Sequence, residues 1–128
     1  MSGDAPLNRD EDSRRAQLLK GLAELALLSL LRDGPQYGLA ILDRLRLEAG
    51  LQLAEGTIYP LLHRLEKANC IRAQWRIEEA GTRPRKYYAL TKAGSTELEL
   101  LTSEWQKVSG ALGAFLARKS TRHDRHNK

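Results

Sequence analysis

The stretch from Glu55 to Lys67 constrains the fold of this chain most strongly, because it combines an apolar stripe with a basic and aromatic face. Apolar residues recur at i, i+3, i+4 and i+7, the spacing of one side of an α-helix: Ile58, Leu61, Leu62 and Leu65. The spacing predicts a helix of about three turns that begins near Gly56 or Thr57 and ends near Ala68 or Asn69. Pro60 is tolerated if it lies in the first turn, where its missing N–H would have no intrahelical partner.

The opposite face of this helix carries hydroxyl, imidazole and cationic groups. Such groups can hydrogen-bond to base edges or phosphates and can neutralise phosphate charge. We expect this face to lie in the major groove of DNA, with contacts from Thr57, Tyr59, Pro60, His63, Arg64 and Lys67. An ordinary solvated face of an amphipathic helix is also polar, so for this helix alone both interpretations stay open.

The segments on either side predict a helix-turn-helix followed by a hairpin. Residues 34–38 form a turn signal, and an apolar helical run from Leu39 to Leu47 ends at Gly50. Residues 51–54 connect this run to the basic helix. Downstream, apolar and polar residues alternate from Ile71 to Ile77 with the period of a strand, residues 78–84 form a turn, and residues 86–90 return as a second strand.

This order of elements predicts a mainly α chain with a small β-hairpin wing, that is, a winged helix-turn-helix. The basic residues near the hairpin tip can reach a phosphate backbone or a minor groove: Arg83, Arg85 and Lys86. We expect Tyr37 to touch the DNA backbone at the entry to the second helix. Trp75 alternates with Ile77 on one strand face and is expected in the core.

Three blocks of the sequence resemble the phenolic acid decarboxylase regulator (PadR) family of bacterial transcriptional repressors. The blocks are LLSLLRDGPQYG (residues 27–38), GTIYPLLHRLE (56–66) and RKYYALTKAG (85–94), and the similarity runs from about Leu18 to Phe115. The resemblance implies a dimeric DNA-binding repressor. Asn69 stands where such sequences usually carry Gly after the recognition helix, and Leu39 stands where many members have an aromatic residue. Asn can adopt the same backbone conformation as Gly.

Residues 92–117 are predicted to form a long C-terminal dimerisation helix. Its apolar residues are spaced 3, 4, 3, 4 and 3 apart, which is a heptad seam: Leu98, Leu101, Trp105, Val108, Leu112 and Phe115. We predict a two-fold homodimer in which this helix packs against the N-terminal helix, residues 18–31, and against its mate in the other subunit. Leu18, Leu22 and Leu25 would join the interface. The alternative is that the stripe folds back onto its own domain.

Trp105 has two interpretations. Some PadR members bind flat aromatic or hydrophobic effectors at the dimer interface, where a Trp of the C-terminal helix can stack on the ligand. Trp105 matches that position by its place in the seam, so the resemblance implies a small aromatic effector. A large apolar anchor of the dimer interface explains the same residue.

Composition agrees with a nucleic-acid partner. The 128 residues carry a formal net charge of +5 and fit one domain with extensions. Residues 1–13 are interpreted as a disordered leader, residues 14–91 as the winged-helix domain and residues 118–128 as a basic disordered tail. No run approaches the roughly 20 apolar residues of a membrane span. The single Cys70 favours a reducing cytoplasm, and either a buried inert thiol or a redox sensor would explain it.

We expect no catalytic site, cofactor or metal. His63 has no carboxylate or thiol at ligand spacing, and His123 and His126 lie in the predicted tail. The expected partners are double-stranded DNA and a second copy of the chain. The alternative function is a winged-helix dimer that binds protein as a scaffold without specific DNA binding.

Overall fold

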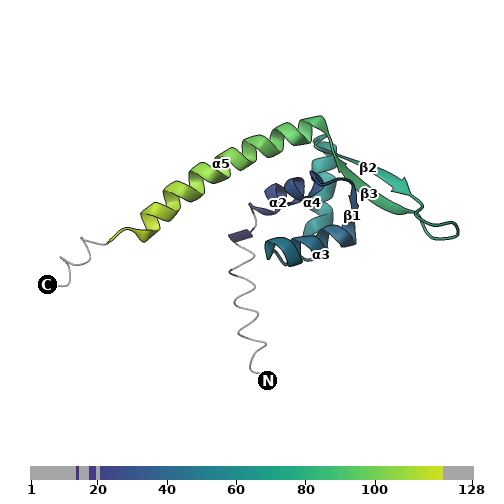
Figure 1. Cartoon of the computed structure of the whole chain (residues 1–128), viewed down its shortest axis with the longest axis horizontal. Helices are drawn as coiled ribbons and strands as arrows, with labels where there is room; N and C mark the ends of the chain where they lie inside the picture. Colours follow the sequence, from purple (N-terminus) through teal and green to yellow (C-terminus); the bar gives the residue numbers. More distant parts are fainter. Residues whose placement is uncertain (1–13, 15–17, 20, 120–128) are drawn as a thin grey trace, which may run out of the picture. The chain divides into compact units, whose positions relative to one another are not determined.

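The computed structural model describes residues 14, 18, 19 and 21–119 (Figure 1). The predicted leader and the tail from residue 120, with His123 and His126, lie outside the described residues. The elements follow in the order α2 (Ala23–Leu31), β1 (Gln36–Tyr37), α3 (Gly38–Ala49), α4 (Glu55–Lys67), β2 (Ile71–Arg76), β3 (Arg85–Leu90) and α5 (Lys92–Ala117). This is the winged helix-turn-helix that the sequence predicts, so the predicted fold class is confirmed.

The described chain divides after Leu98 into two units. In the first unit, α2, α3 and α4 enclose an apolar core with the sheet. Its largest fully buried side chains are Leu27, Leu28, Leu31, Ile41, Ile58, Leu62, Ile71 and Leu98. Burying a side chain of this size stabilises the fold by roughly 1.5–3 kcal/mol relative to leaving it exposed.

The predicted first helix, residues 18–31, is interrupted in the structure. Residues 18 and 19 are helical, Gly21 and Leu22 form a turn, and α2 begins at Ala23. The backbone N–H of Leu22 donates to the carbonyl of Leu19 at 2.9 Å. Gly is a weak helix former because it loses the most backbone entropy, which explains a break at this position.

The C-terminal ends of α3 and α4 agree closely with the prediction. Helix α3 ends at Ala49 and is capped by Gly50, which adopts the left-handed conformation with φ 69°. Helix α4 is followed by Asn69, also left-handed with φ 65°, so Asn69 takes the conformation expected of a glycine there.

The start of α4 differs from the prediction by one or two residues. The helix begins at Glu55, so Pro60 lies inside the helix, in the second turn, and not in the first turn. Pro60 therefore leaves the carbonyl of Gly56 without its usual i+4 donor. Gly56 and Pro60 are both exposed, so water can satisfy that carbonyl.

The sheet has the order β1-β3-β2 and is antiparallel throughout. Strands β2 and β3 form the predicted hairpin and pair over six residues, from Ile71 opposite Leu90 to Arg76 opposite Arg85. The sequence did not predict β1, because two residues are too few to show a strand period. Its Gln36 side chain donates to the carbonyl of Leu30 at 3.0 Å and so ties the strand to the end of α2.

Trp75 is not a core residue, contrary to the prediction. Its side chain is 68% exposed and Ile77 is exposed as well. The hairpin extends beyond the helices (Figure 1), so the alternation continues after the core has ended. The ammonium group of Lys86, the cross-strand partner, lies 6.0 Å from the centre of the Trp75 ring.

The junction of the hairpin with α5 explains part of the third sequence block. The Thr91 hydroxyl donates to the Asn69 carbonyl at 2.6 Å and accepts the backbone N–H of Gly94 at 2.9 Å. Thr91 therefore caps α5 while joining it to the end of α4. A Cβ atom on Gly94 would collide with the backbone carbonyl of Cys70, so only glycine fits at this position.

Helix α5 has the predicted bounds, and most of its seam is exposed in the single chain. Leu98 is the exception, because it is 2% exposed and belongs to the core of the first unit. The exposed seam residues of α5 are Trp105, Val108, Leu112 and Phe115, while Leu101 is half-buried. Among the described residues, no helix has both the length and the apolar content for crossing a membrane.

Candidate nucleic-acid interface

Helix α4 presents one fixed face to solvent because its other face is locked in the core. Ile58, Leu61, Leu62 and Leu65 are all buried. At 100° per residue, the centre of the opposite face falls on Gly56, Pro60, His63 and Lys67, all of which are exposed. We call these four residues the α4 ridge.

One flank of α4 packs against the start of α3. A Cβ atom placed on Gly38 would lie 2.5 Å from the Tyr59 hydroxyl oxygen and 2.8 Å from its ring atom Cε1. The tip of the Tyr59 ring therefore occupies the space that a larger residue at 38 would need. Tyr59 remains 40% exposed, and partial burial raises the pKa of its hydroxyl. Tyr59 thus positions α4 against α3 in addition to being a candidate DNA contact.

The other flank of α4 is tied to α2. Arg64 Nη2 donates a hydrogen bond to Glu24 Oε1 at 2.9 Å, and the two groups form an ion pair. The Arg64 side chain is 67% exposed, so the ion pair contributes little stability, about 0.2–1 kcal/mol. Arg64 can reach a phosphate only by sharing or leaving Glu24, a competition that the sequence did not reveal.

The predicted backbone contact, Tyr37, lies at the end of β1 immediately before α3. Its ring packs edge-on against Tyr87 with 5.5 Å between the ring centres. The Arg85 guanidinium lies 4.4 Å from the centre of the Tyr37 ring, so two predicted DNA contacts touch each other. The structure therefore brings the entry to α3 and the wing into one surface.

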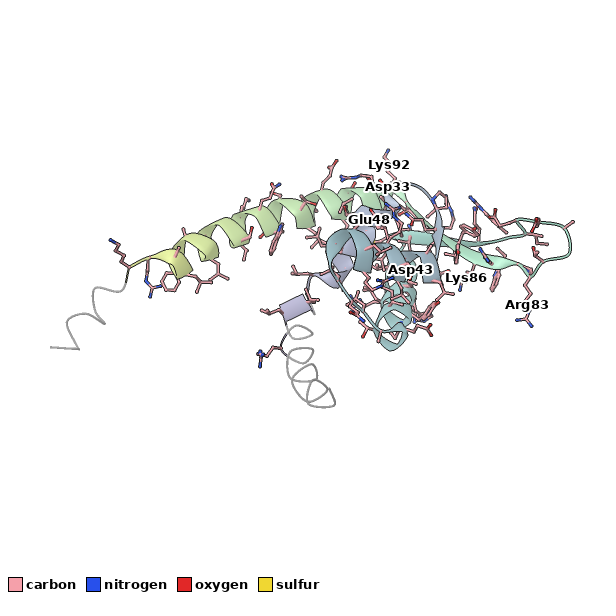
Figure 2. The ribbon with its side chains drawn as sticks, turned by 60° about the horizontal axis from the view of Figure 1, so that its bottom comes forward. Asp33, Asp43, Glu48, Arg83, Lys86 and Lys92 are labelled. Atoms are coloured by element: carbon pink, nitrogen blue, oxygen red, sulfur yellow. The ribbon has the colours of Figure 1, made fainter. Side chains whose placement is uncertain are left out.

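The remaining wing residues project from the hairpin. Arg83 lies in the exposed loop between β2 and β3, and Figure 2 shows its side chain extending into solvent near the hairpin end. Lys86 is half-buried on β3, where its ammonium group lies 5.6 Å from the centre of the Tyr88 ring and 6.0 Å from the centre of the Trp75 ring. Arg83 is thus the more extended of the two cations.

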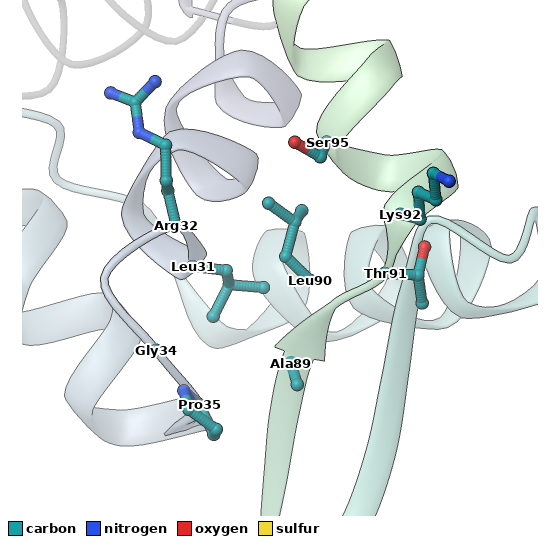
Figure 3. A pocket seen from close by; sticks show the side chains of 9 residues that line it. All are labelled: Leu31, Arg32, Gly34, Pro35, Ala89, Leu90, Thr91, Lys92 and Ser95. Carbon is teal, nitrogen blue, oxygen red and sulfur yellow. The ribbon is translucent and has the colours of Figure 1, made fainter.

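The C-terminal end of strand β3 borders a shallow pocket of about 530 Å³ (Figure 3). Leu31 and Leu90 lie at its centre, and Arg32 and Lys92 stand on either side. Trp105, the candidate effector residue, does not line this pocket. Between residues 21 and 119, no group of three His, Cys, Asp or Glu side chains is arranged to hold a metal ion.

Cys70 lies at the junction of α4 and β2 and is buried. Burial raises the pKa of its thiol, with smaller contributions from the carboxylates of Glu97 and Glu24. A raised pKa lowers the fraction of reactive thiolate. The environment of Cys70 therefore favours the inert buried thiol over a redox sensor.

Comparison with known proteins identifies the family. The sequence matches the transcriptional regulator PadR-like family over residues 27–100, more than half of the chain. The chain belongs to the PadR-like family. PadR-family members are transcriptional regulators and not enzymes, so the prediction that this chain is not an enzyme is confirmed.

Solved structures of the PadR-like family support the same assignment. A PadR family transcriptional regulator from Eggerthella lenta is 29% identical, with a TM-score of 0.76 over 89% of this chain and 98% of the other. A PadR-like transcriptional regulator from Bacillus cereus is 30% identical, with a TM-score of 0.71 over 80% and 99% of the two chains. "Uncharacterized protein X" of Lysinibacillus sphaericus is 30% identical over 80% of this chain and 94% of its own length.

The packing of Tyr59 on Gly38 in this PadR-like chain yields a stability prediction. Gly38→Ala should lower the free energy of unfolding by at most about 1 kcal/mol, because the added methyl group displaces only the tip of the partly exposed Tyr59 side chain, which can move. In a Tyr59→Ala background the same substitution should cost much less, since the space is then free. Urea denaturation of the four proteins measures this coupling.

Gly56→Ala on the same helix is the matched control, because nothing lies within 4 Å of a Cβ atom at that position. It should leave stability unchanged or raise it slightly. An equal cost of Gly38→Ala in both backgrounds would show that Tyr59 does not depend on Gly38.

Proposed function

We propose that this PadR-like regulator binds a palindromic promoter operator as a homodimer and represses transcription by occluding the promoter. The α4 ridge is the observation that carries this proposal. It is an exposed helical surface on a helix whose rotation is fixed by four buried residues and by contacts on both flanks. A helix held in this way can present the same groups to a major groove each time it binds.

Within this proposal, the ridge and the wing have different roles. His63 and Thr57 would read base edges, while Lys67 and Arg64 would contact the flanking phosphates. Tyr37 and Tyr59 would touch the DNA backbone beside them. Arg83, Arg85 and Lys86 would form the wing contact in the adjacent groove or on its phosphates.

The dimer is supported by the exposed seam of α5. Trp105, Val108, Leu112 and Phe115 are 43–54% exposed in the single chain, and such an apolar stripe on a helix indicates a partner surface. A two-fold dimer would place two α4 ridges on half-sites about 34 Å apart, which gives one short helix enough specificity. Leu18, Leu22 and Leu25 are exposed or half-buried and would complete the interface.

Promoter binding tests the proposal. Fluorescence anisotropy with the chain's own upstream promoter DNA, compared with a scrambled duplex across a salt series, should show tight, sequence-preferring and salt-steep binding. Lys67→Ala should weaken binding to both duplexes and reduce the slope of log K against log salt by about 0.9, the value for one phosphate contact. Lys107→Ala, an exposed lysine of α5, is the control and should leave the slope unchanged.

Weak and equal binding of both duplexes would contradict the proposed function as a repressor that binds a specific operator. That result would favour the other function considered from the sequence, a winged-helix dimer that binds protein as a scaffold. An unchanged slope for Lys67→Ala, with specific binding by the wild type, would remove only Lys67 from the phosphate contacts.

Substitution in the seam tests the dimer. Leu112→Arg places a charge within the exposed apolar stripe and should convert the dimer into a monomer in sedimentation velocity experiments. Leu100→Arg is the matched control, because Leu100 is a similarly exposed leucine of α5 that lies outside the seam. Loss of the dimer with both variants, or with neither, would contradict the proposed interface.

We also propose that a small, flat aromatic or hydrophobic effector stacks on Trp105 and releases the operator by changing the angle between the subunits. The protein has two tryptophans, so a Trp75→Phe background leaves Trp105 as the only one. An effector that releases DNA should quench the fluorescence of this variant at the same concentrations. Release without quenching would place the effector elsewhere. A single cysteine, Cys70, cannot form a disulfide within the chain, and the proposed partner is DNA. Both features are consistent with a protein that acts in the cytoplasm.

A further inference from the structure

The outer face of the sheet carries a group of arginines around two tyrosines. Residues two apart on a strand share a face, and the register places Arg76 opposite Arg85 and Tyr87 between Gln74 and Tyr37. We call this surface the arginine–tyrosine face; it consists of Tyr37, Arg72, Gln74, Arg76, Arg85 and Tyr87. Its arginines are exposed, whereas Tyr87 is buried beneath them.

Arg76 and Arg85 are cross-strand partners of like charge. Such pairs destabilise a sheet unless an opposite charge lies near them. Within residues 21–119, the ion pairs of the structure involve Arg44, Arg46 and Arg64, so neither Arg76 nor Arg85 has a carboxylate within 4.0 Å. The nearby acid is Glu78, whose carboxylate beside the Tyr87 hydroxyl raises the pKa of that hydroxyl, while Arg85 acts in the opposite direction.

Each of the two guanidinium groups is held over an aromatic ring. Arg76 lies 5.0 Å from the centre of the Tyr87 ring, and Arg85 lies 4.4 Å from the centre of the Tyr37 ring. Stacking occupies the flat side of a guanidinium and leaves the N–H groups on its edge able to donate. The two tyrosines, in edge-to-face contact, therefore hold the guanidinium groups of two cross-strand partners over their rings, and Arg85 also lies beside the Tyr87 hydroxyl.

We propose that Arg76 and Arg85 together form a clamp for one phosphate of the DNA backbone. The proposal rests on the DNA-binding function proposed above and adds Arg76, a strand residue outside the wing tip. The clamp connects to α4 through successive contacts: Arg85 stacks on Tyr37, Tyr37 precedes Gly38, and Gly38 packs against Tyr59. A phosphate is the expected anion because it accepts several donors at once from paired arginines.

The test uses the full chain with Arg76→Gln and Arg85→Gln, singly and together, in anisotropy measurements with operator DNA across a salt series. The double variant should bind about tenfold more weakly at low salt. Its slope of log K against log salt should fall by about 0.9, the value for one phosphate, and not by about 1.8. Its thermal midpoint without DNA should be unchanged or higher, because a like-charge repulsion has been removed.

The matched control is Arg32→Gln with Lys92→Gln, which removes two exposed cations beside the pocket at the other end of β3. It should leave the slope unchanged. An unchanged slope in the clamp variant, a loss of about two phosphate contacts, or a parallel loss of binding and thermal stability would each overturn the clamp.

A second experiment, thermal unfolding in inorganic phosphate, distinguishes failure of the clamp from failure of the proposed function. Inorganic phosphate should raise the thermal midpoint of the wild type but not of the double variant, whatever the preference for operator DNA. If the wild type shows no operator preference, the proposed function fails, and the clamp is then judged by this arm alone. Stabilisation by phosphate without any effect of the substitutions on DNA binding would assign the clamp to a free anion and overturn the backbone assignment.

Discussion

The burial of one apolar face of α4 determines what the rest of this protein can present to a partner. Ile58, Leu61, Leu62 and Leu65 leave a single rotation for the helix, since any other would expose leucine and bury charge. Each buried side chain contributes roughly 1.5–3 kcal/mol, several times more than an exposed ion pair. The apolar face therefore sets the orientation of α4, and the polar contacts only refine it.

The polar and aromatic residues of α4 divide into two groups. Tyr59 and Arg64 lie on the flanks and hold the helix against its neighbours through Gly38 and Glu24. The ridge residues between them are exposed, and within residues 21–119 none of them forms an ion pair or a side-chain hydrogen bond. On the sheet, stacking on tyrosine similarly fixes arginine side chains in the unbound protein, which reduces the conformational entropy lost on binding.

The sequence predicts most of the fold because the period of apolar residues follows directly from burial. The sequence does not predict contacts between residues that are far apart along the chain but close in space. Forty residues separate Arg64 from Glu24, so spacing cannot reveal their ion pair. Strand alternation at Trp75 specifies a face but not how far the hairpin extends beyond the core. The packing of Tyr59 on Gly38 joins two helices whose periods, taken separately, place Tyr59 only on an outer flank.

The central claim is that His63 of the α4 ridge reads bases, while Arg64 on the flank of α4 and the wing bind the backbone. The ratio of affinities for operator and scrambled duplex at one salt concentration tests it most directly, in the wild type, His63→Ala and Arg64→Ala. The account predicts that His63→Ala lowers the ratio, whereas Arg64→Ala weakens binding to both duplexes equally and preserves it. A ratio that is unchanged by His63→Ala but lost with Arg64→Ala would contradict the assignment of His63 as a base-reading residue.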